Sequence, residues 1–197
     1  TQRLADSGMR KGFACLFYGA PGTGKTETVL QLARKTGRAL MQVNISSIKD
    51  KYVGESEKNI KNLFDRYRQL VESEPIAPIL FFNEADAIFN KRSENTERAV
   101  DKMENAIQNI ILQEMETLEG ILIATTNLTS NLDSAFERRF IYKVKFAAPS
   151  LEAKQAIWQS MIPSLSEEDA ATLASAYNFS GGQIENIARK QQVEYIL

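Results

Sequence analysis

Five short apolar runs, each about as long as a β-strand, are spaced along the chain. They are FACLFY (13–18), ALMQVNI (39–45), ILFF (79–82), ILIATT (121–126) and IYKVKF (141–146). Each of the first four is followed by a segment with helical spacing, or by a loop that leads into one. Strands and helices that alternate in this way favour a parallel sheet with helices on both faces, and such sheets bind ligands beyond the carboxyl ends of their strands. The sequence therefore predicts an α/β fold whose functional residues lie in the loops after the strands.

Two of the intervening segments have the spacing of amphipathic helices. Apolar residues recur at the i, i+3, i+4 and i+7 positions within 55–73 and again within 97–118. After residue 148 the strand pattern ends, and the chain reads as helices only. We therefore expect an α/β domain over residues 1–148 and a small helical domain, truncated at its end, over residues 149–197.

Composition and charge exclude several classes of protein. The chain has 197 residues, 43% of them hydrophobic, and a net charge of −1, which gives no reason to expect binding to nucleic acid or to an anionic membrane. Its single cysteine, Cys15, has no partner for an internal disulfide, and the sequence contains neither a long apolar run nor a signal-peptide pattern. These features predict a cytoplasmic protein. The abrupt ends of the sequence lead us to expect a fragment of a longer polypeptide.

The segment GAPGTGKT directly follows the first predicted strand and precedes a predicted helix, and it matches the phosphate-binding pattern GxxxxGK[ST]. Its residues are Gly19, Ala20, Pro21, Gly22, Thr23, Gly24, Lys25 and Thr26. Glycines allow the backbone N–H groups to surround phosphate oxygens, and the start of the helix adds its positive dipole end. We expect Lys25 to reach the β and γ phosphates and the Thr26 hydroxyl to bind Mg²⁺. The segment predicts a nucleotide site with ATP and Mg²⁺ as its cofactors.

Several motifs, in this order and spacing, resemble those of AAA+ ATPases. They are GAPGTGKT (19–26, Walker A), KYVGESEKNIKNLF (51–64), ILFFNEADAIF (79–89, Walker B), IATTN (123–127), LDSAFERRF (132–140) and SGGQIEN (180–186). The resemblance covers nearly all of residues 13–190. It implies a P-loop NTPase with an AAA+ core, in which a five-stranded parallel sheet is flanked by helices, and a small helical lid. It also implies assembly into a ring, usually a hexamer, with ATP bound between neighbouring subunits.

The resemblance assigns roles to residues at the ends of three predicted strands. Glu84 corresponds to the general base that polarises the attacking water, and Asn127 to a sensor amide that orients this water; a solvated acid and a turn asparagine are the plainer alternatives. Asn83 stands where the family usually has an aspartate that supports Mg²⁺. An amide keeps the oxygen acceptor but lacks the negative charge, so we expect weaker metal binding at an active site. Asn44 resembles the polar residue that in many members holds the catalytic glutamate in an inactive pose.

Two adjacent arginines, Arg138 and Arg139, correspond to the arginine finger of the family. Such a residue reaches the γ-phosphate bound by a neighbouring subunit and stabilises the charge of the transition state. Arg139, next to Phe140, is the first candidate for this role. The adjacency of the two arginines leaves open which one reaches the phosphate, and a pair of surface salt bridges is the alternative.

The segment Tyr52, Val53 and Gly54 matches the aromatic–hydrophobic–glycine pore loop of ring translocases. An exposed aromatic side chain on such a loop grips many different side chains of a threaded polypeptide, since the contact is mostly apolar area. In the alternative, Tyr52 packs against its own domain.

The main functional hypothesis is therefore an ATPase that forms a homo-oligomeric ring, a hexamer by resemblance, and remodels or translocates a protein substrate. A nucleotide-dependent scaffold that hydrolyses ATP weakly is the first alternative, because Asn83 replaces an acid. A clamp loader or helicase loader is the second, and the near-neutral charge and the type of pore loop disfavour it.

Overall fold

The computed structural model describes residues 12–44, 55–90, 99–127 and 132–196. These residues divide into two compact units. The first contains the described residues up to Tyr18 together with Thr26–Lys145. The second contains Gly19–Lys25 and the described residues from Phe146 onward. Within the described part, no helix combines the length and the apolar composition that a membrane crossing requires.

The first unit is built on a five-stranded sheet with the strand order β2-β3-β4-β1-β5. The strands are β1 (Phe13–Gly19), β2 (Leu40–Asn44), β3 (Ile79–Asn83), β4 (Ile121–Thr126) and β5 (Tyr142–Phe146). β2 pairs with β3, β3 with β4, and β4 with β1, all in parallel. All five apolar runs are thus strands, and the predicted fold class is confirmed.

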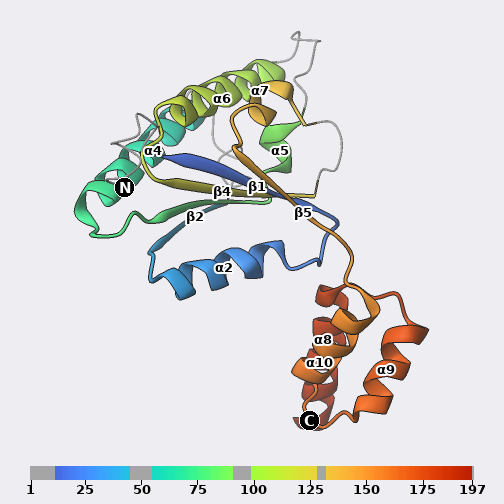
Figure 1. Ribbon diagram of the computed structural model, residues 1–197. Coiled ribbons are helices and arrows are strands. Elements are labelled where there is room, and N and C mark those ends of the chain that lie inside the picture. Colours follow the sequence, from blue (N-terminus) through green and yellow to red (C-terminus); the bar gives the residue numbers. More distant parts are fainter. Residues whose placement is uncertain (1–11, 45–54, 91–98, 128–131, 197) are drawn as a thin grey trace. The chain divides into compact units, whose positions relative to one another are not determined.

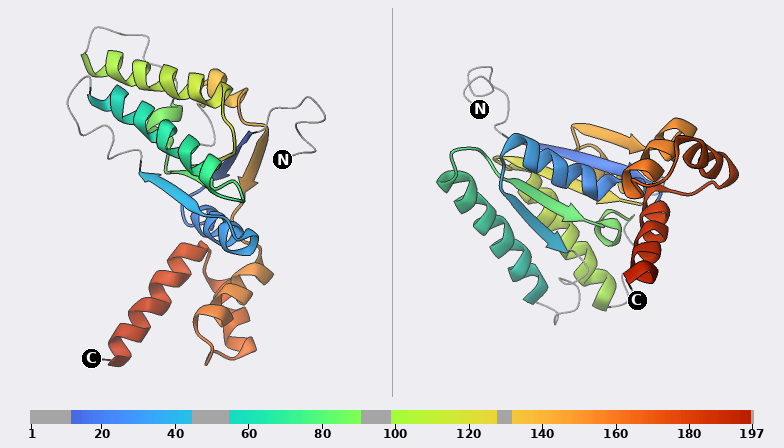
Figure 2. Two further views of the ribbon diagram at one scale, coloured as in Figure 1. Left: turned by 90° about the vertical axis from the view of Figure 1, so that its left-hand side faces the viewer. Right: turned by 90° about the horizontal axis from the view of Figure 1, so that it is seen from below.

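Helices cover both faces of this sheet (Figure 1). One face carries α2 (Lys25–Thr36). The other carries the remaining helices that the structure describes in this unit: α4 (Glu55–Ser73), α5 (Asp86–Phe89), α6 (Ala99–Glu116) and α7 (Ser134–Glu137). α4 and α6 lie side by side on that face, as both figures show (Figure 2). The predicted helix over 55–73 coincides with α4, and the one predicted over 97–118 contains α6.

The main hydrophobic core lies between the sheet and the α4–α6 face. Leu16, Leu80, Phe82 and Leu122 from the strands join Phe64, Ile111 and Phe136 from the helices, and all are buried. The neighbouring strand residues Cys15, Phe81 and Ile123 point to the opposite face, since successive side chains of a strand alternate. Because both faces are covered, the central strands β1, β3 and β4 read as continuous apolar runs rather than as an alternation. The edge strand β5 is exposed along most of its length.

Tyr67 on α4 joins that helix to the starts of two strands. Its ring is fully buried, and its Oη accepts a hydrogen bond from the N–H of Ile121 at 2.8 Å. The carbonyl oxygens of Pro78 and Ile121 lie 2.8 and 3.0 Å from the same Oη. Gly120, at φ +125°, must be glycine here, because a Cβ would lie 2.3 Å from the Tyr67 hydroxyl.

We expect Tyr67→Phe to lower the free energy of unfolding by about 1–3 kcal/mol, because it leaves a buried backbone N–H without this partner. Burial raises the pKa of Tyr67 from 10.0 to about 12. Between these pH values Tyr67 ionises in the unfolded chain but stays neutral in the folded chain. The contribution of Tyr67 to the free energy of unfolding is therefore fully present below pH 10 and is lost as the pH rises toward 12. Urea unfolding at a series of alkaline pH values should show a shallower decline for Tyr67→Phe than for the wild type.

Cys15 provides the internal control in this comparison. Burial raises the pKa of its thiol to about 11, so it contributes to the alkaline decline of both proteins and cancels in their difference. Declines of equal slope in both proteins would contradict the assignment to Tyr67.

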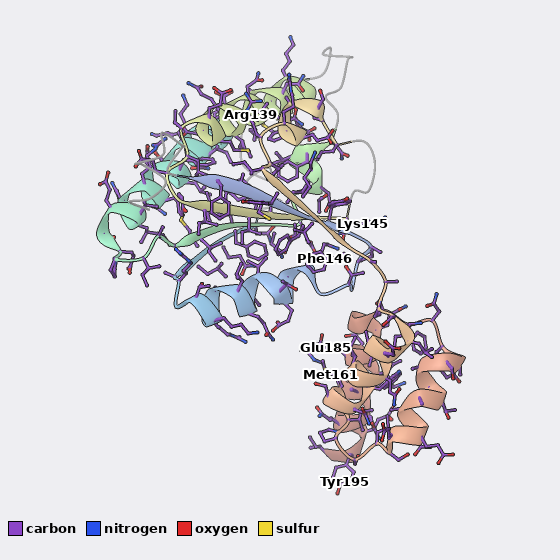
Figure 3. The ribbon with its side chains drawn as sticks, viewed as in Figure 1. Arg139, Lys145, Phe146, Met161, Glu185 and Tyr195 are labelled. Atoms are coloured by element: carbon purple, nitrogen blue, oxygen red, sulfur yellow. The ribbon has the colours of Figure 1, made fainter. Side chains whose placement is uncertain are left out.

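The described residues of the second unit form three helices: α8 (Leu151–Met161), α9 (Glu167–Ala176) and α10 (Gly181–Ile196). They bury a small core of Trp158, Ala170, Ala174 and Ile184. The hydroxyls of Ser150 and Ser166 cap α8 and α9 by accepting hydrogen bonds from backbone N–H groups of the first turn. In Figure 3, Met161 and Glu185 mark α8 and α10, and Tyr195 marks the last turn of α10.

Candidate active site

The segment Gly19–Lys25 belongs to the second unit and connects the end of β1 to the start of α2. Gly22 and Gly24 have φ values of +74° and +89°, which L-amino acids with a side chain rarely adopt. An ideal Cβ on Gly24 would meet no heavy atom within 4 Å, so the backbone conformation alone requires glycine there. The Thr23 hydroxyl donates to the carbonyl of Ala20 at 2.8 Å and closes the turn. The sequence thus forms the strand–loop–helix arrangement that its pattern predicts.

Lys25, the first residue of α2, is buried, and its ammonium group contacts the loop. Its Nζ donates hydrogen bonds to the carbonyl oxygens of Gly19 and Ala20, both at 2.8 Å. The positive charge therefore lies within the loop that the pattern assigns to phosphate.

The start of α10 contacts the same loop within the second unit. The N–H of Gly182 donates to the carbonyl of Gly22 at 3.1 Å. A Cβ on Gly22 would lie 2.5 Å from the Ser180 hydroxyl oxygen. Ser180 and Gln183 cap the helix reciprocally, since each side chain accepts from the other's backbone N–H. The glycines at 181 and 182 thus bring the backbone of α10 directly against the loop.

In the first unit, the end of β3 is joined to α2 and to β4 by hydrogen bonds. Oδ1 of Asn83 accepts from the hydroxyl of Thr26 at 3.0 Å and from that of Thr125 at 3.0 Å. The expected metal residues, Thr26 and Asn83, are therefore in direct contact. Asn44, at the end of β2, lies beside Asn83 in the strand register.

Glu84 directly follows β3 in an unusual backbone conformation. Its φ of +52° makes it the non-glycine residue with positive φ among the described residues. Its N–H donates to the hydroxyl of Thr125 at 3.0 Å, and the N–H of Ala85 donates to the Thr125 carbonyl at 2.9 Å. The side chain of Glu84 is exposed. Strained backbone of this kind is concentrated at functional sites, because the surrounding contacts must hold it in place.

Asn127 follows β4 and is anchored by Asp86, the first residue of α5. Oδ1 of Asp86 accepts from the backbone N–H of Asn127 at 2.7 Å and from the hydroxyl of Thr126 at 2.6 Å. The ends of β3 and β4 therefore bring Asn83, Glu84 and Asn127 to one edge of the sheet, as the sequence predicts.

The two arginines have different surroundings. Arg139 donates to the carbonyl oxygens of Leu112 and Ala135, at 3.2 and 2.9 Å, and forms an ion pair with Glu116; Figure 3 shows it beside α6. Arg138 is exposed, and its Nε donates to the Ser134 carbonyl at 3.3 Å. Both line a cavity of about 570 Å³. Arg139, the first candidate for a residue that reaches a neighbouring subunit, is tied to its own unit.

Sequence reasoning missed two features of the site: the contacts of Thr125 and the anchoring of Asn127 by Asp86. Thr125 would have been found from the register, because Phe82 pairs with Ala124 and the next step along both strands sets Asn83 beside Thr125. The predicted pore-loop residues, Tyr52, Val53 and Gly54, lie outside the described residues.

The donor groups at the site fit a magnesium–nucleotide complex. In the first unit, Thr26 and Asn83 offer oxygen ligands, which Mg²⁺ prefers. In the second unit, Lys25 offers the charge that phosphates require. Among the described residues no three His, Cys, Asp or Glu side chains gather as a metal site. Mg²⁺ is commonly bound by few protein groups together with substrate phosphates, so this sparse set is compatible with it.

Comparison with known proteins agrees with this geometry. Residues 15–148 match the family described as "ATPase family associated with various cellular activities (AAA)". The chain is 28% identical over 200 residues to ATPase family gene 2 protein homolog B of Bos taurus, covering 98% of the chain and 26% of that protein. It is 32% identical over 185 residues to Vacuolar protein sorting-associated protein 4B of Mus musculus, covering 88% and 40%. Fidgetin-like protein 1 of Drosophila melanogaster is 28% identical over 183 residues, covering 88% and 34%. The chain thus spans less than half the length of these relatives.

Proposed function

The chain belongs to the AAA ATPase family and is an ATPase domain. From this premise we propose that it assembles into a homo-oligomeric ring, a hexamer, which uses ATP hydrolysis to remodel or translocate protein substrates. The observation that carries the proposal is the contact between Thr26 and Asn83, with Glu84 directly after Asn83. In the proposed organisation, residues 1–148 are the nucleotide-binding core and residues 149–197 the lid, and the protein works in the cytoplasm.

In the proposed site, the segment Gly19–Thr26 binds the phosphates of ATP through its backbone N–H groups and Lys25. Thr26 is a direct ligand of Mg²⁺, and Asn83 supports the ion indirectly. Bound Mg²⁺ neutralises phosphate charge during the transfer. These assignments are supported by the positive-φ glycines, the placement of the Lys25 ammonium and the oxygen atoms of Thr26 and Asn83.

Glu84 takes the proton of the attacking water, and the Asn127 side chain orients that water. The left-handed backbone at Glu84 supports this role, since such conformations at non-glycine residues are uncommon and are concentrated at functional sites. The anchoring of the Asn127 backbone by Asp86 supports the role of Asn127. The exposed Arg138 completes the catalytic set in the proposed ring by reaching a neighbouring subunit, and Arg139 has a structural role in its own unit through Leu112, Ala135 and Glu116.

The protein substrate is proposed from the sequence of the pore-loop segment, Tyr52 to Gly54. A scaffold that binds ATP and hydrolyses it weakly is the second candidate. Asn83 favours it, since an amide beside Mg²⁺ lacks the charge of a carboxylate.

ATP turnover per subunit, measured against protein concentration, tests the proposal. The full-length protein should show a cooperative rise, because a site shared between subunits is complete only in the ring. Lys25→Ala, which loses the charge in the phosphate loop, measures the background. An unfolded protein should stimulate turnover and single-stranded DNA should not. A rate that is independent of concentration would contradict the ring, and turnover at the Lys25→Ala background would favour the scaffold.

A further inference from the structure

The Thr125 hydroxyl forms hydrogen bonds with both Asn83 and Glu84, the two residues at the end of β3 that the proposed site uses. Thr125 is the fifth residue of β4, it is 1% exposed, and its hydroxyl oxygen lies 3.0 Å from both the Glu84 nitrogen and Oδ1 of Asn83. A backbone N–H can only donate, so the Thr125 oxygen accepts from Glu84. The hydroxyl proton is then free to be donated to Asn83.

This chain of hydrogen bonds determines which way the Asn83 amide faces. An amide has one acceptor end and one donor end, whereas a carboxylate has two equivalent acceptors. Thr125 and Thr26 both direct their hydroxyl protons at Oδ1 of Asn83. With the amide reversed, an NH₂ group would face both hydroxyls, and neither proton would have this acceptor.

We propose that Thr125 is a positioning residue for ATP hydrolysis, which keeps the oxygen of the Asn83 amide toward Thr26 and holds the backbone of Glu84. This inference rests on the proposed function of the site. It assigns to Thr125 the task that makes an amide usable at this position: the donor end of Asn83 is kept away from the Thr26 hydroxyl, whose oxygen is the proposed metal ligand.

The second half of the task concerns Glu84. Thr125 accepts hydrogen bonds from two successive backbone N–H groups. The N–H of Glu84 donates to the Thr125 hydroxyl oxygen, and the N–H of Ala85 donates to the Thr125 carbonyl oxygen. These two bonds fix the turn in which Glu84 adopts its φ of +52°. Without the hydroxyl, the left-handed conformation of Glu84 loses one of the contacts that hold it.

Thr125→Val and Thr125→Ser separate the hydroxyl from the shape of the side chain, because valine keeps the shape and serine keeps the hydroxyl. We expect Thr125→Val to lower kcat roughly tenfold, the effect of about one lost hydrogen bond, with a small change in KM. It should also raise the Mg²⁺ concentration needed for binding of a fluorescent, non-hydrolysable ATP analogue. Thr125→Ser should stay close to the wild type in both measurements.

A double-mutant cycle with Asn83→Asp tests the orienting role itself. An aspartate presents an oxygen in either orientation, so Thr125→Val should cost clearly less in kcat and in Mg²⁺ dependence when Asp replaces Asn83. Equal costs in both backgrounds would overturn the orienting role, and so would a Thr125→Ser variant as impaired as Thr125→Val.

Thermal unfolding checks that the variants are folded, and Thr125→Ala replaces Thr125→Val if the valine variant does not fold. The analogue titration needs no turnover. If the wild type hydrolyses no ATP, the proposed function fails, while the effect of Thr125 on Mg²⁺-dependent binding still decides this inference.

Discussion

Glu84→Gln should reduce ATP turnover by a factor of about 10²–10⁴, because glutamine cannot take the proton of the attacking water. Nucleotide binding should remain, since the phosphate loop and the Thr26–Asn83 contact are untouched. The backbone bonds that hold residue 84 involve its N–H and not its side chain, so the free energy of unfolding should change by less than about 0.5 kcal/mol. Phosphate release, an ATP-binding isotherm and urea unfolding measure the three quantities.

Glu72→Gln is the matched control for this experiment. Glu72 is also exposed, but it lies near the end of α4, next to Val71, which packs at the start of β4 rather than at the carboxyl ends of the strands. Its amide variant should hydrolyse ATP like the wild type. Glu84→Gln with turnover close to that of Glu72→Gln would remove Glu84 from the role of general base.

The second large effect should separate the two adjacent arginines. Arg138→Ala should lower turnover on the order of 10³-fold, as expected for an arginine finger, and leave stability unchanged. Arg139→Ala should lower the free energy of unfolding by about 1–3 kcal/mol, because it removes a charged donor from two carbonyl oxygens and from Glu116. Turnover and urea unfolding of both variants test the contrast.

Two further experiments test whether Arg138 is the arginine finger. Arg138→Lys should restore little activity, since a lysine lacks the planar donor pair of a guanidinium. In rings mixed from Arg138→Ala and Glu84→Gln subunits, turnover should persist wherever an intact Glu84 meets an intact Arg138 of the neighbour. Stability loss in Arg138→Ala, or loss of turnover in Arg139→Ala without loss of stability, would reverse the assignment.

The fold could be predicted from the sequence because its physical causes are local. The central strands β1, β3 and β4 are covered on both faces, so each reads as an uninterrupted apolar run. The helix over 55–73 follows from the spacing of its own buried residues, Ile60, Phe64 and Tyr67. The location of the site followed from topology, since the carboxyl ends of parallel strands lie at one edge.

What the sequence could not reveal depends on contacts between distant segments. Thr125 and Asn83 are neighbours only because β4 pairs with β3, and a one-residue change of register would separate them. The two backbone acceptors of Arg139 are carbonyl oxygens, and a carbonyl is present at every residue and carries no signature in the sequence. Sequence reasoning therefore favoured Arg139 as the finger. The contacts of Arg139 within its own unit favour the exposed Arg138 instead.

The hydrogen bond from Gly182 to Gly22 joins two backbone atoms and no side chain. Every amino acid except proline supplies the same N–H, but an ideal Cβ at position 182 would lie 3.2 Å from the Cα of Gly22, so a side chain there requires α10 and the loop to move slightly apart. Gly22 is constrained more strongly, since its φ and its distance to Ser180 both demand glycine. A saturation library should therefore find position 22 intolerant of every substitution and position 182 tolerant of small side chains only.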